Sequence, residues 1–431
     1  MPRSSGPPSR GPAWRRPLAL AVEIGLLLRV LAADLVQWRL DRAGDGRVCL
    51  LPDSEYYWRL AQTIRDGEVF QIVEWGDVPH FALRTPGYPL FLAACRLATG
   101  DNPLGARLIQ AALGAACVWL VYRLTIATLG EDRRSAALVA AALTAVHPYF
   151  IATSALLLTE AVFVPLLLVF LWAAAVLWDR QSARGAVAPG LAAGGAAAAA
   201  VLVRPSCLLF FPMVVAAWWA SRLAARRAPG PVLVGTLAMA LAFVATMAPW
   251  WVRNARVYGE FVPTALWMGA SLYDGLNPDA TGGSDMMRFL ADPDVWPLDE
   301  RDQDRRLKAR AVAFARENPG RVASLAVVKL GRYWSPWPNA EAAGPAWVRI
   351  AAGAVMTPLL VLMAFGLWTL HRDARAWALL AGPILYFAAV HAVFASSMRY
   401  RTPGEFPAMA TAAVGLLRAA GDPRRGVDRR T

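Results

Sequence analysis

The chain has 431 residues, of which 57% are hydrophobic and only 17% charged, and its mean hydropathy is +0.38. A soluble protein of this length cannot bury apolar runs such as 231–251 and 348–370, and these runs lack the two-residue alternation of barrel strands. Only helices satisfy their own backbone groups in lipid, so the composition predicts an all-α polytopic membrane protein. The net charge of +13 comes from arginines at the ends of apolar runs, which argues for a lipid bilayer and against nucleic acid.

Ten runs have the character of membrane spans, each of about 20 residues or fewer where neighbours bury them. They lie at 17–38, 103–129, 135–153, 157–178, 187–203, 206–222, 231–251, 346–370, 375–396 and 405–420. With residues 1–16 in the cytoplasm, most other arginine-rich short loops and the tail at 421–431 also fall inside. The sequence thus predicts one transmembrane domain over 17–420 in the plasma (inner) membrane, with both termini cytoplasmic and disordered tails.

Two large segments then lie outside the membrane. The first, 39–102, contains an apolar stretch at 86–98 that is too short to cross and is expected to be re-entrant or interfacial. The second, 252–345, is rich in Asp, Pro and Gly and becomes helical near 301–316 and 321–334. We expect any chemistry to use polar residues from these external segments and from the short external turns.

The first span carries three charges, Glu23, Arg29 and Asp34. Charged side chains are costly in lipid, so all three are expected to face the bundle. We interpret the two carboxylates as structural partners of arginines in other helices, with a functional role as the alternative.

The first external loop opens a helix with Asp53 and Glu55, followed by Tyr56 and Tyr57. Aromatic residues at this point of the chain suit a helix that lies in the membrane interface, at the level of the lipid headgroups. The carboxylates either take part in catalysis or, in the simpler interpretation, Asp53 or its neighbour Ser54 caps the helix.

Five other external sites carry charges. Glu160 begins an apolar span, where a carboxylate usually faces a cavity or a partner. Arginine binds phosphate through two parallel hydrogen bonds, so an arginine-rich set of turns suits a lipid-phosphate ligand. Anchoring at the membrane interface is the alternative for each of them. The candidate cations are Arg84, Arg204, Lys329, Arg332, Arg399 and Arg401.

The chain lacks a P-loop, a dinucleotide-binding glycine fingerprint, a His-Glu-x-x-His motif and a Gly-x-Ser-x-Gly elbow. Its four histidines and four cysteines show no ligand spacing, so no metal site or disulfide framework is predicted. A divalent cation remains possible at the loop aspartates, although such residues are usually solvated. These are Asp279, Asp285, Asp292 and Asp294.

Taken in order, nine short motifs resemble the GT-C superfamily of membrane glycosyltransferases, in the protein O-mannosyltransferase and aminoarabinose-transferase branch. The resemblance covers most of the chain. Its motifs are Asp53-Ser-Glu-Tyr-Tyr, Arg84-Thr-Pro-Gly-Tyr-Pro-Leu, Arg107 with Tyr122-Arg-Leu, His147-Pro-Tyr with Leu158-Thr-Glu, Leu202-Val-Arg-Pro, Pro249-Trp-Trp-Val-Arg-Asn, Gly275-Leu-Asn-Pro with Asn277, Arg332-Tyr-Trp-Ser-Pro, and Arg399-Tyr-Arg-Thr-Pro with Tyr400.

The resemblance implies a bundle of about ten helices, a polyprenyl-phosphate sugar donor and an external, periplasmic-side active site. It maps the essential carboxylate of the family onto Asp53, whereas Ser54 separates Asp53 from Glu55 where relatives have adjacent Asp-Glu. We therefore expect a mannosyltransferase-like hexosyl- or pentosyltransferase of the cell envelope, acting on an unknown glycan, lipid or protein acceptor. A single displacement with Asp53 as base would invert the anomeric centre, with Glu160 positioning the acceptor or holding the arginines.

Two alternatives come from other classes. A transporter or flippase of lipid-linked sugars would use inverted repeats and paired interrupted helices, and neither is evident in the sequence. A non-catalytic membrane scaffold would not require carboxylates and arginines at so many external turns.

Overall fold

The computed structural model describes residues 14–44, 49–73, 78–286, 292–339 and 346–421. Two strands, β1 (Ile72–Val73) and β2 (Pro79–His80), pair antiparallel with Ile72 opposite His80, and the remaining elements are helices. The helices of the long bundle are α1 (Arg15–Ala43), α4 (Pro103–Leu129), α5 (Arg134–Val146), α6 (Pro148–Ala155), α7 (Glu160–Trp178), α8 (Ala183–Val203), α9 (Phe210–Ala224), α10 (Gly230–Tyr258), α15 (Ala346–Thr369), α16 (Ala374–Ala376), α17 (Gly382–Val393) and α18 (Thr402–Ala419). Short turns η1 (Glu131–Arg133), η2 (Pro205–Cys207), η3 (Trp377–Ala381) and η4 (Met398–Arg401) connect them.

The prediction of an all-α polytopic membrane protein is confirmed. Each of the ten predicted ranges is largely helical, and within the described residues seven helices are long and apolar enough to cross a membrane. An eighth span arises if the bent pair α5–α6 counts as one. The first and last predicted spans, α1 and α18, do not pass this length and hydropathy test, so the count of ten is not confirmed. The expected disorder of the tails concerns residues that lie almost entirely outside the described ranges.

Small residues set the distance between several helices. A Cβ added at Gly194 of α8 would lie 2.0 Å from the Met239 carbonyl oxygen of α10, and one at Gly366 of α15 would lie 1.8 Å from the Thr411 oxygen of α18. The alanine-rich α8 packs against both α7 and α10 in this way. Close backbone approach supplies the van der Waals contact that holds helices together in lipid.

A buried arginine repairs the break between α5 and α6, which are bent by 52°. Pro148 has no N–H to donate to the carbonyl of Thr144, so the last carbonyls of α5 need other donors. Arg29 of α1 is fully buried, and its guanidinium donates to Thr144 O at 3.1 Å, Ala145 O at 3.1 Å and Gly25 O at 2.8 Å. The charge predicted to face the bundle therefore does so as the cap of a broken helix.

The other two charges of α1 lie elsewhere. Glu23 and Asp34 fall on the exposed face of this helix, and no ion pair joins them to an arginine in the described part of the chain. The prediction that these carboxylates face the bundle is wrong. Their near-common face follows from the eleven-residue spacing, but the buried face is the one that carries Arg29.

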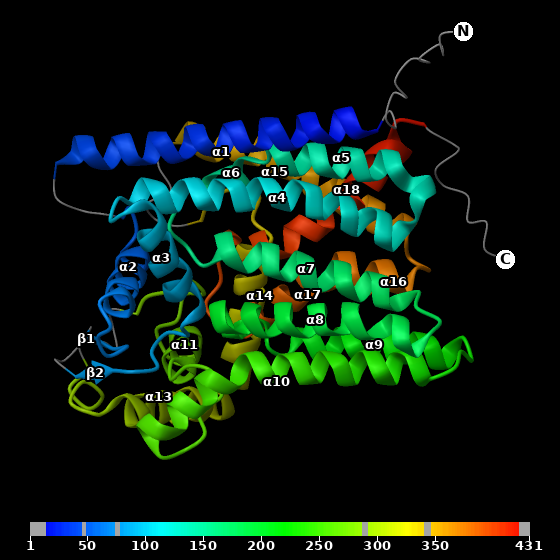
Figure 1. Cartoon of the computed structure of the whole chain (residues 1–431). Helices are drawn as coiled ribbons and strands as arrows, with labels where there is room; N and C mark the ends of the chain where they lie inside the picture. Colours follow the sequence, from blue (N-terminus) through cyan, green and yellow to red (C-terminus); the bar gives the residue numbers. More distant parts are fainter. Residues whose placement is uncertain (1–13, 45–48, 74–77, 287–291, 340–345, 422–431) are drawn as a thin grey trace, which may run out of the picture.

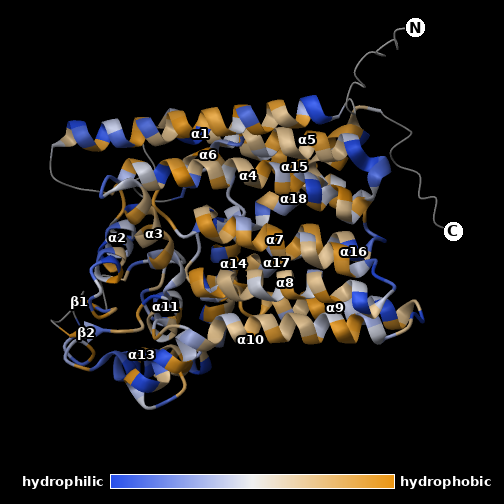
Figure 2. Ribbon diagram, in the orientation of Figure 1, coloured by the Kyte–Doolittle hydropathy of each residue, from blue (hydrophilic) through white to orange (hydrophobic). Residues whose placement is uncertain are grey.

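The polar segments between α1 and α4 and between α10 and α15 gather at one end of the bundle. Figure 1 shows α2 (Pro52–Arg65), the β hairpin, α3 (Gly87–Thr99), α11 (Met268–Gly275) and α13 (Glu300–Glu317) together at the left, whereas α1 begins and α18 ends at the right. α14 (Pro319–Tyr333) leads from this region back into the bundle, where it packs on α17. The contrast between polar end and apolar bundle is clear in Figure 2. At 13 residues α3 is only about 20 Å long, short of the roughly 30 Å hydrocarbon core.

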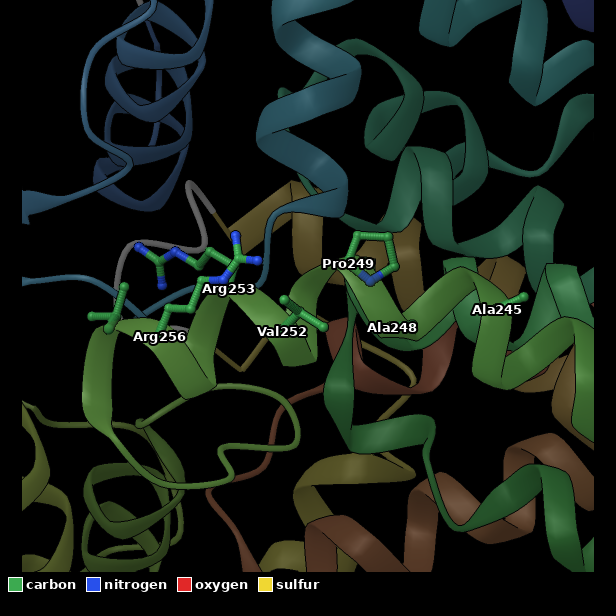
Figure 3. Close-up of a pocket in the computed structure, with 7 residues that line it drawn as sticks. Ala245, Ala248, Pro249, Val252, Arg253 and Arg256 are labelled. Atoms are coloured by element: carbon green, nitrogen blue, oxygen red, sulfur yellow. The ribbon is translucent and has the colours of Figure 1, made fainter.

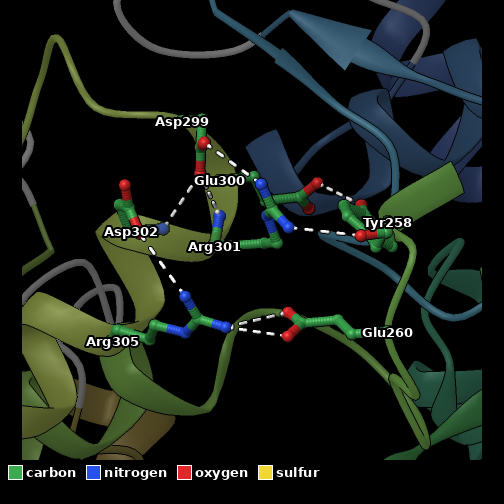
Figure 4. Close-up of polar contacts among 7 residues, drawn as sticks. All are labelled: Tyr258, Glu260, Asp299, Glu300, Arg301, Asp302 and Arg305. Atoms are coloured by element: carbon green, nitrogen blue, oxygen red, sulfur yellow. Dashed lines mark hydrogen bonds and ion pairs between the residues drawn. The ribbon is translucent and has the colours of Figure 1, made fainter.

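A buried carboxylate joins the two polar segments. Glu300, at the start of α13, accepts hydrogen bonds from the backbone N–H groups of Phe81 and Ala82 at 2.8 and 3.0 Å, and from the Tyr258 hydroxyl. Figure 4 shows Glu300 facing Tyr258, with Arg305 paired to Glu260 beside them. This contact fixes the backbone two and three residues before Arg84.

Substituting Arg29 tests the capping role. We expect Arg29→Ala to lower the free energy of unfolding by about 3 kcal/mol, because two or more buried carbonyls lose their donor and a cavity forms. Arg39→Ala, at an exposed position of the same helix, should change it by less than about 0.5 kcal/mol. Unfolding in detergent micelles followed by circular dichroism measures both, and equal losses would contradict the role.

Candidate active site

Asp53 stands in the first turn of α2 with its side chain 52% exposed. The helix begins at Pro52 after the extended residue Leu51, and no side chain caps its N-terminus. Proline fits the first helical position because that N–H needs no partner there. The capping interpretation of Asp53 and Ser54 is therefore wrong, and the carboxylate of Asp53 points to other partners.

Those partners are arginines from distant parts of the chain. Asp53 Oδ1 lies 3.9 Å from Nη2 of Arg84, and Oδ2 lies 3.7 Å from Nη1 of Arg399 in η4. Arg399 in turn donates from Nε to Glu160 Oε1 at 2.7 Å and from Nη2 to Oε2 at 3.3 Å. One guanidinium thus links a buried carboxylate at the start of α7 to an exposed carboxylate on α2.

Glu160 forms the floor of this cluster, since its side chain is only 1% exposed. Arg204 follows α8, and its Nη1 forms an ion pair with Glu160 Oε1 at 3.0 Å. This nitrogen makes no hydrogen bond to any described residue. Burial alone lowers the pKa of Arg399, but the carboxylate of Glu160 outweighs it and raises that pKa well above its ordinary value. Arg399 therefore stays charged at any physiological pH. We call these five residues, Asp53, Arg84, Glu160, Arg204 and Arg399, the charged cluster.

Aromatic side chains surround the charged cluster. The guanidinium carbon of Arg84 lies 5.0 Å from the ring of Trp267 and 6.0 Å from that of Tyr57. Arg204 lies 5.5 Å from the ring of Tyr400, which stacks on His391 with centroids 4.2 Å apart. Burial raises the pKa of both tyrosine hydroxyls, so they are neutral hydrogen-bond donors at the edge of the cluster.

Three further predicted residues lie at other positions. Glu55 is half-buried and makes no hydrogen bond or ion pair with any described residue. Tyr56 packs on a small apolar group with Leu60. Asn277 closes the end of α11, where its amide donates to Tyr273 O at 2.7 Å.

Three predicted cations are bound to the protein's own backbone. Lys329 is fully buried and its ammonium donates to the carbonyls of Gly275, at 2.8 Å, and Val393. Arg401 is fully buried, pairs with Glu405 and donates to Tyr333 O at 2.6 Å, while Arg332 donates to Ser396 O at 3.1 Å. Burial lowers the pKa of Lys329 to about 8. Because these three side chains are already bound to protein groups, the geometry does not support the prediction that they bind a ligand. That prediction remains untested.

The loop aspartates considered for a divalent cation have arginine or other partners. Asp292 pairs with Arg310 at 2.5 Å, and Asp294 lies 3.3 Å from the same guanidinium. Within the described ranges no three His, Cys, Asp or Glu side chains gather in a metal-binding group.

Two residues that support the site were not predicted from the sequence. Trp267 lies under Arg84 although it follows α10 by nine residues in an irregular segment with no helical or strand pattern. Arg253, near the end of α10, donates to Phe81 O at 2.7 Å and Phe70 O at 2.9 Å and so holds the loop that carries Arg84. The motif Pro-Trp-Trp-Val-Arg-Asn contained Arg253, but its partners are carbonyls that no sequence pattern marks.

With this geometry established, comparisons with known proteins become informative. Residues 83–250, less than half of the chain, match the family model described as dolichyl-phosphate-mannose-protein mannosyltransferase. No curated protein matches the sequence. The archaeal oligosaccharyltransferase AglB from Archaeoglobus fulgidus, solved with an inhibitory peptide and a dolichol-phosphate, is 16% identical and has a TM-score of 0.52 over 94% of this chain and 50% of AglB.

A second structure of the Archaeoglobus fulgidus oligosaccharyltransferase, in the apo form, is 17% identical and has a TM-score of 0.51 over 93% of this chain and 50% of that one. The chain has the GT-C fold. The predicted superfamily resemblance is confirmed at the level of fold. The chain spans about half the length of the oligosaccharyltransferase that it matches.

Replacing Lys329 separates a structural from a ligand-binding role. We expect Lys329→Met to lower the free energy of unfolding by about 2 kcal/mol, because the Gly275 and Val393 carbonyls lose their donor. The chain's other lysine provides the control: Lys308 is exposed, and Lys308→Met should leave stability unchanged. A ligand role would instead predict normal stability with weakened donor binding, measured by thermal unfolding and by titration.

The same lysine predicts a pH dependence. An unfolded lysine titrates near 10.4 and the folded Lys329 near 8, so between these values the unfolded state binds more protons. The wild type should therefore gain stability relative to Lys329→Met as the pH rises from about 8 to about 10. Paired unfolding curves across this range measure the difference in stability. A difference that stays constant with pH would contradict a lowered pKa of the buried Lys329.

Proposed function

We propose that this protein is a membrane glycosyltransferase that moves one sugar from a polyprenyl-phosphate carrier to an acceptor hydroxyl. The observation that carries the proposal is the chain of ion pairs from Asp53 through Arg399 to Glu160. It combines an exposed carboxylate, suited to accept a proton, with cations fixed by a buried carboxylate. The fold and the mannosyltransferase family match over 83–250 support the same class of reaction.

The charge of the cluster favours a carrier with a single phosphate. Three arginines and two carboxylates leave a net charge of one positive unit, which complements the single negative charge of a phosphodiester. A diphosphate linkage would bring a second negative charge and lack a matching cation in this set. AglB was solved with a dolichol-phosphate, which is the chemistry expected of the lipid product here.

The transfer would be a single displacement. The acceptor oxygen forms a bond to the anomeric carbon while the bond from that carbon to the phosphate oxygen breaks, and its electron pair leaves with the lipid phosphate. Asp53 takes the hydroxyl proton, and Arg84, Arg204 and Arg399 stabilise the charge that develops on the phosphate. Glu160 is the positioning residue, since it orients two of these guanidinium groups before substrate arrives. The anomeric centre would be inverted.

The sidedness follows from charge placement. The charged cluster belongs to the end of the bundle formed by α2, α3 and α11, whereas the turns from α4 to α5, α7 to α8 and α9 to α10 lie at the opposite end (Figure 1). Those turns carry the arginine pairs that favour the cytoplasm. We infer an active site on the external face of the plasma membrane. The acceptor is an unidentified glycan, lipid or protein.

Release of free polyprenyl phosphate from a synthetic polyprenyl-phosphate sugar in the presence of acceptor tests the reaction. Asp53→Asn should slow this release at least about 100-fold without altering stability, since a positioned base contributes that much. Asp66→Asn, at an exposed carboxylate just after the same helix, is the matched control and should retain activity. Normal turnover by Asp53→Asn would contradict the assignment.

Glu160→Gln tests the positioning role separately. We expect a KM for the donor about tenfold higher together with a lower kcat, because Arg399 keeps its charge but loses its fixed direction. A flippase would show a different result: labelled lipid would move between leaflets with its sugar–phosphate bond intact, in the wild type and in Asp53→Asn alike.

A further inference from the structure

A groove of about 540 Å³ lies along α10, and none of its lining residues belongs to the charged cluster. Figure 3 shows Arg253 and Arg256 with their side chains on the side of the helix that carries Pro249. The rest of the lining is apolar, and none of the described residues that line it is acidic. The lining residues are Ala245, Ala248, Pro249, Val252, Arg253, Arg256 and Val257.

The two arginines differ in what they already bind. Arg253 is occupied by the carbonyls of Phe70 and Phe81. Arg256 is exposed and makes no hydrogen bond or ion pair with any described residue. The groove therefore presents one fixed and one uncommitted guanidinium next to apolar walls. A ligand with an anionic head and an apolar body would match both.

The position of the groove along α10 defines the depth of that ligand. The helix has 29 residues and is about 43 Å long, so it exceeds a hydrocarbon core of about 30 Å by more than two turns. If its first turns, next to the basic loop at 222–227, mark the inner boundary, Arg253 and Arg256 reach the outer headgroup layer, where lipid phosphates lie. Below them an exposed apolar stripe at Leu237, Leu241 and Val244 runs along the helix.

We propose that this groove binds an anionic phospholipid of the surrounding bilayer, with its phosphate at Arg256 and its acyl chain along α10. The proposal is independent of the transfer reaction. Because Arg253 at the same site holds the backbone of the first external segment, a bound lipid also stabilises the loop that carries Arg84. The segment is thereby anchored to the membrane surface at a second point, besides α3.

The test uses the full-length protein in zwitterionic phosphatidylcholine micelles titrated with phosphatidylglycerol, with retained lipids counted by native mass spectrometry. The wild type should retain phosphatidylglycerol over phosphatidylcholine, and Arg256→Gln should reduce that preference about fivefold, as expected for one arginine at a membrane surface. Val252→Trp, which fills the groove and keeps both arginines, should reduce it similarly.

Arg349 provides the matched control, because it is an exposed arginine at the first turn of α15 and does not line this groove. Arg349→Gln should leave the preference unchanged. An equal loss with Arg349→Gln, or no preference in the wild type, would overturn the proposal. Displacement of phosphatidylglycerol by equimolar undecaprenyl phosphate would also overturn it, since the groove would then belong to the carrier lipid.

Discussion

The arrangement of the site depends on one buried carboxylate. Glu160 is almost inaccessible at the start of an apolar helix, and an unpaired charge there would cost several kcal/mol. Arg399 and Arg204 neutralise it, and in doing so they bring η4 and the segment after α8 to the end of α7. Arg399 also forms an ion pair with Asp53. The buried Glu160 therefore orients the guanidinium that faces the exposed carboxylate.

Arginine serves two purposes in this fold, and the partner distinguishes them. Arg29, Arg253 and Arg401 donate to backbone carbonyls, and they hold a broken helix, a loop and the turn that follows α14. Arg84 and Arg399 instead approach the exposed carboxylate of Asp53. A phosphate entering the cluster would compete with Asp53 for these guanidinium groups, whereas a carbonyl-bound arginine would have to abandon a backbone group that has no other donor.

The two polar segments support the cluster through backbone contacts rather than through a large apolar core. Glu300 binds the backbone N–H groups of Phe81 and Ala82, and Arg253 binds the carbonyls of Phe70 and Phe81. Main-chain contacts of this kind fix the path of an irregular loop without depending on the identity of its side chains. Arg84, which directly follows this loop, gains its orientation from them and from the ring of Trp267.

The class of the fold could be predicted from the sequence, because apolar runs of span length leave helices as the only structure that satisfies their backbone in lipid. The sequence's longer set of candidate site residues included Asp53, Arg84, Glu160, Arg204 and Arg399, since charges at the ends of apolar helices are costly and stand out. Which of the candidate cations lie beside Asp53 and Glu160 depends on the tertiary contacts. Lys329 and Arg401 look equivalent to Arg399 in the sequence. In the fold, however, carbonyls at the ends of helices lie beside Lys329 and Arg401, and both side chains donate to them. The exposure of Glu23 and Asp34 was decided in the same way, by which face of α1 its neighbours cover.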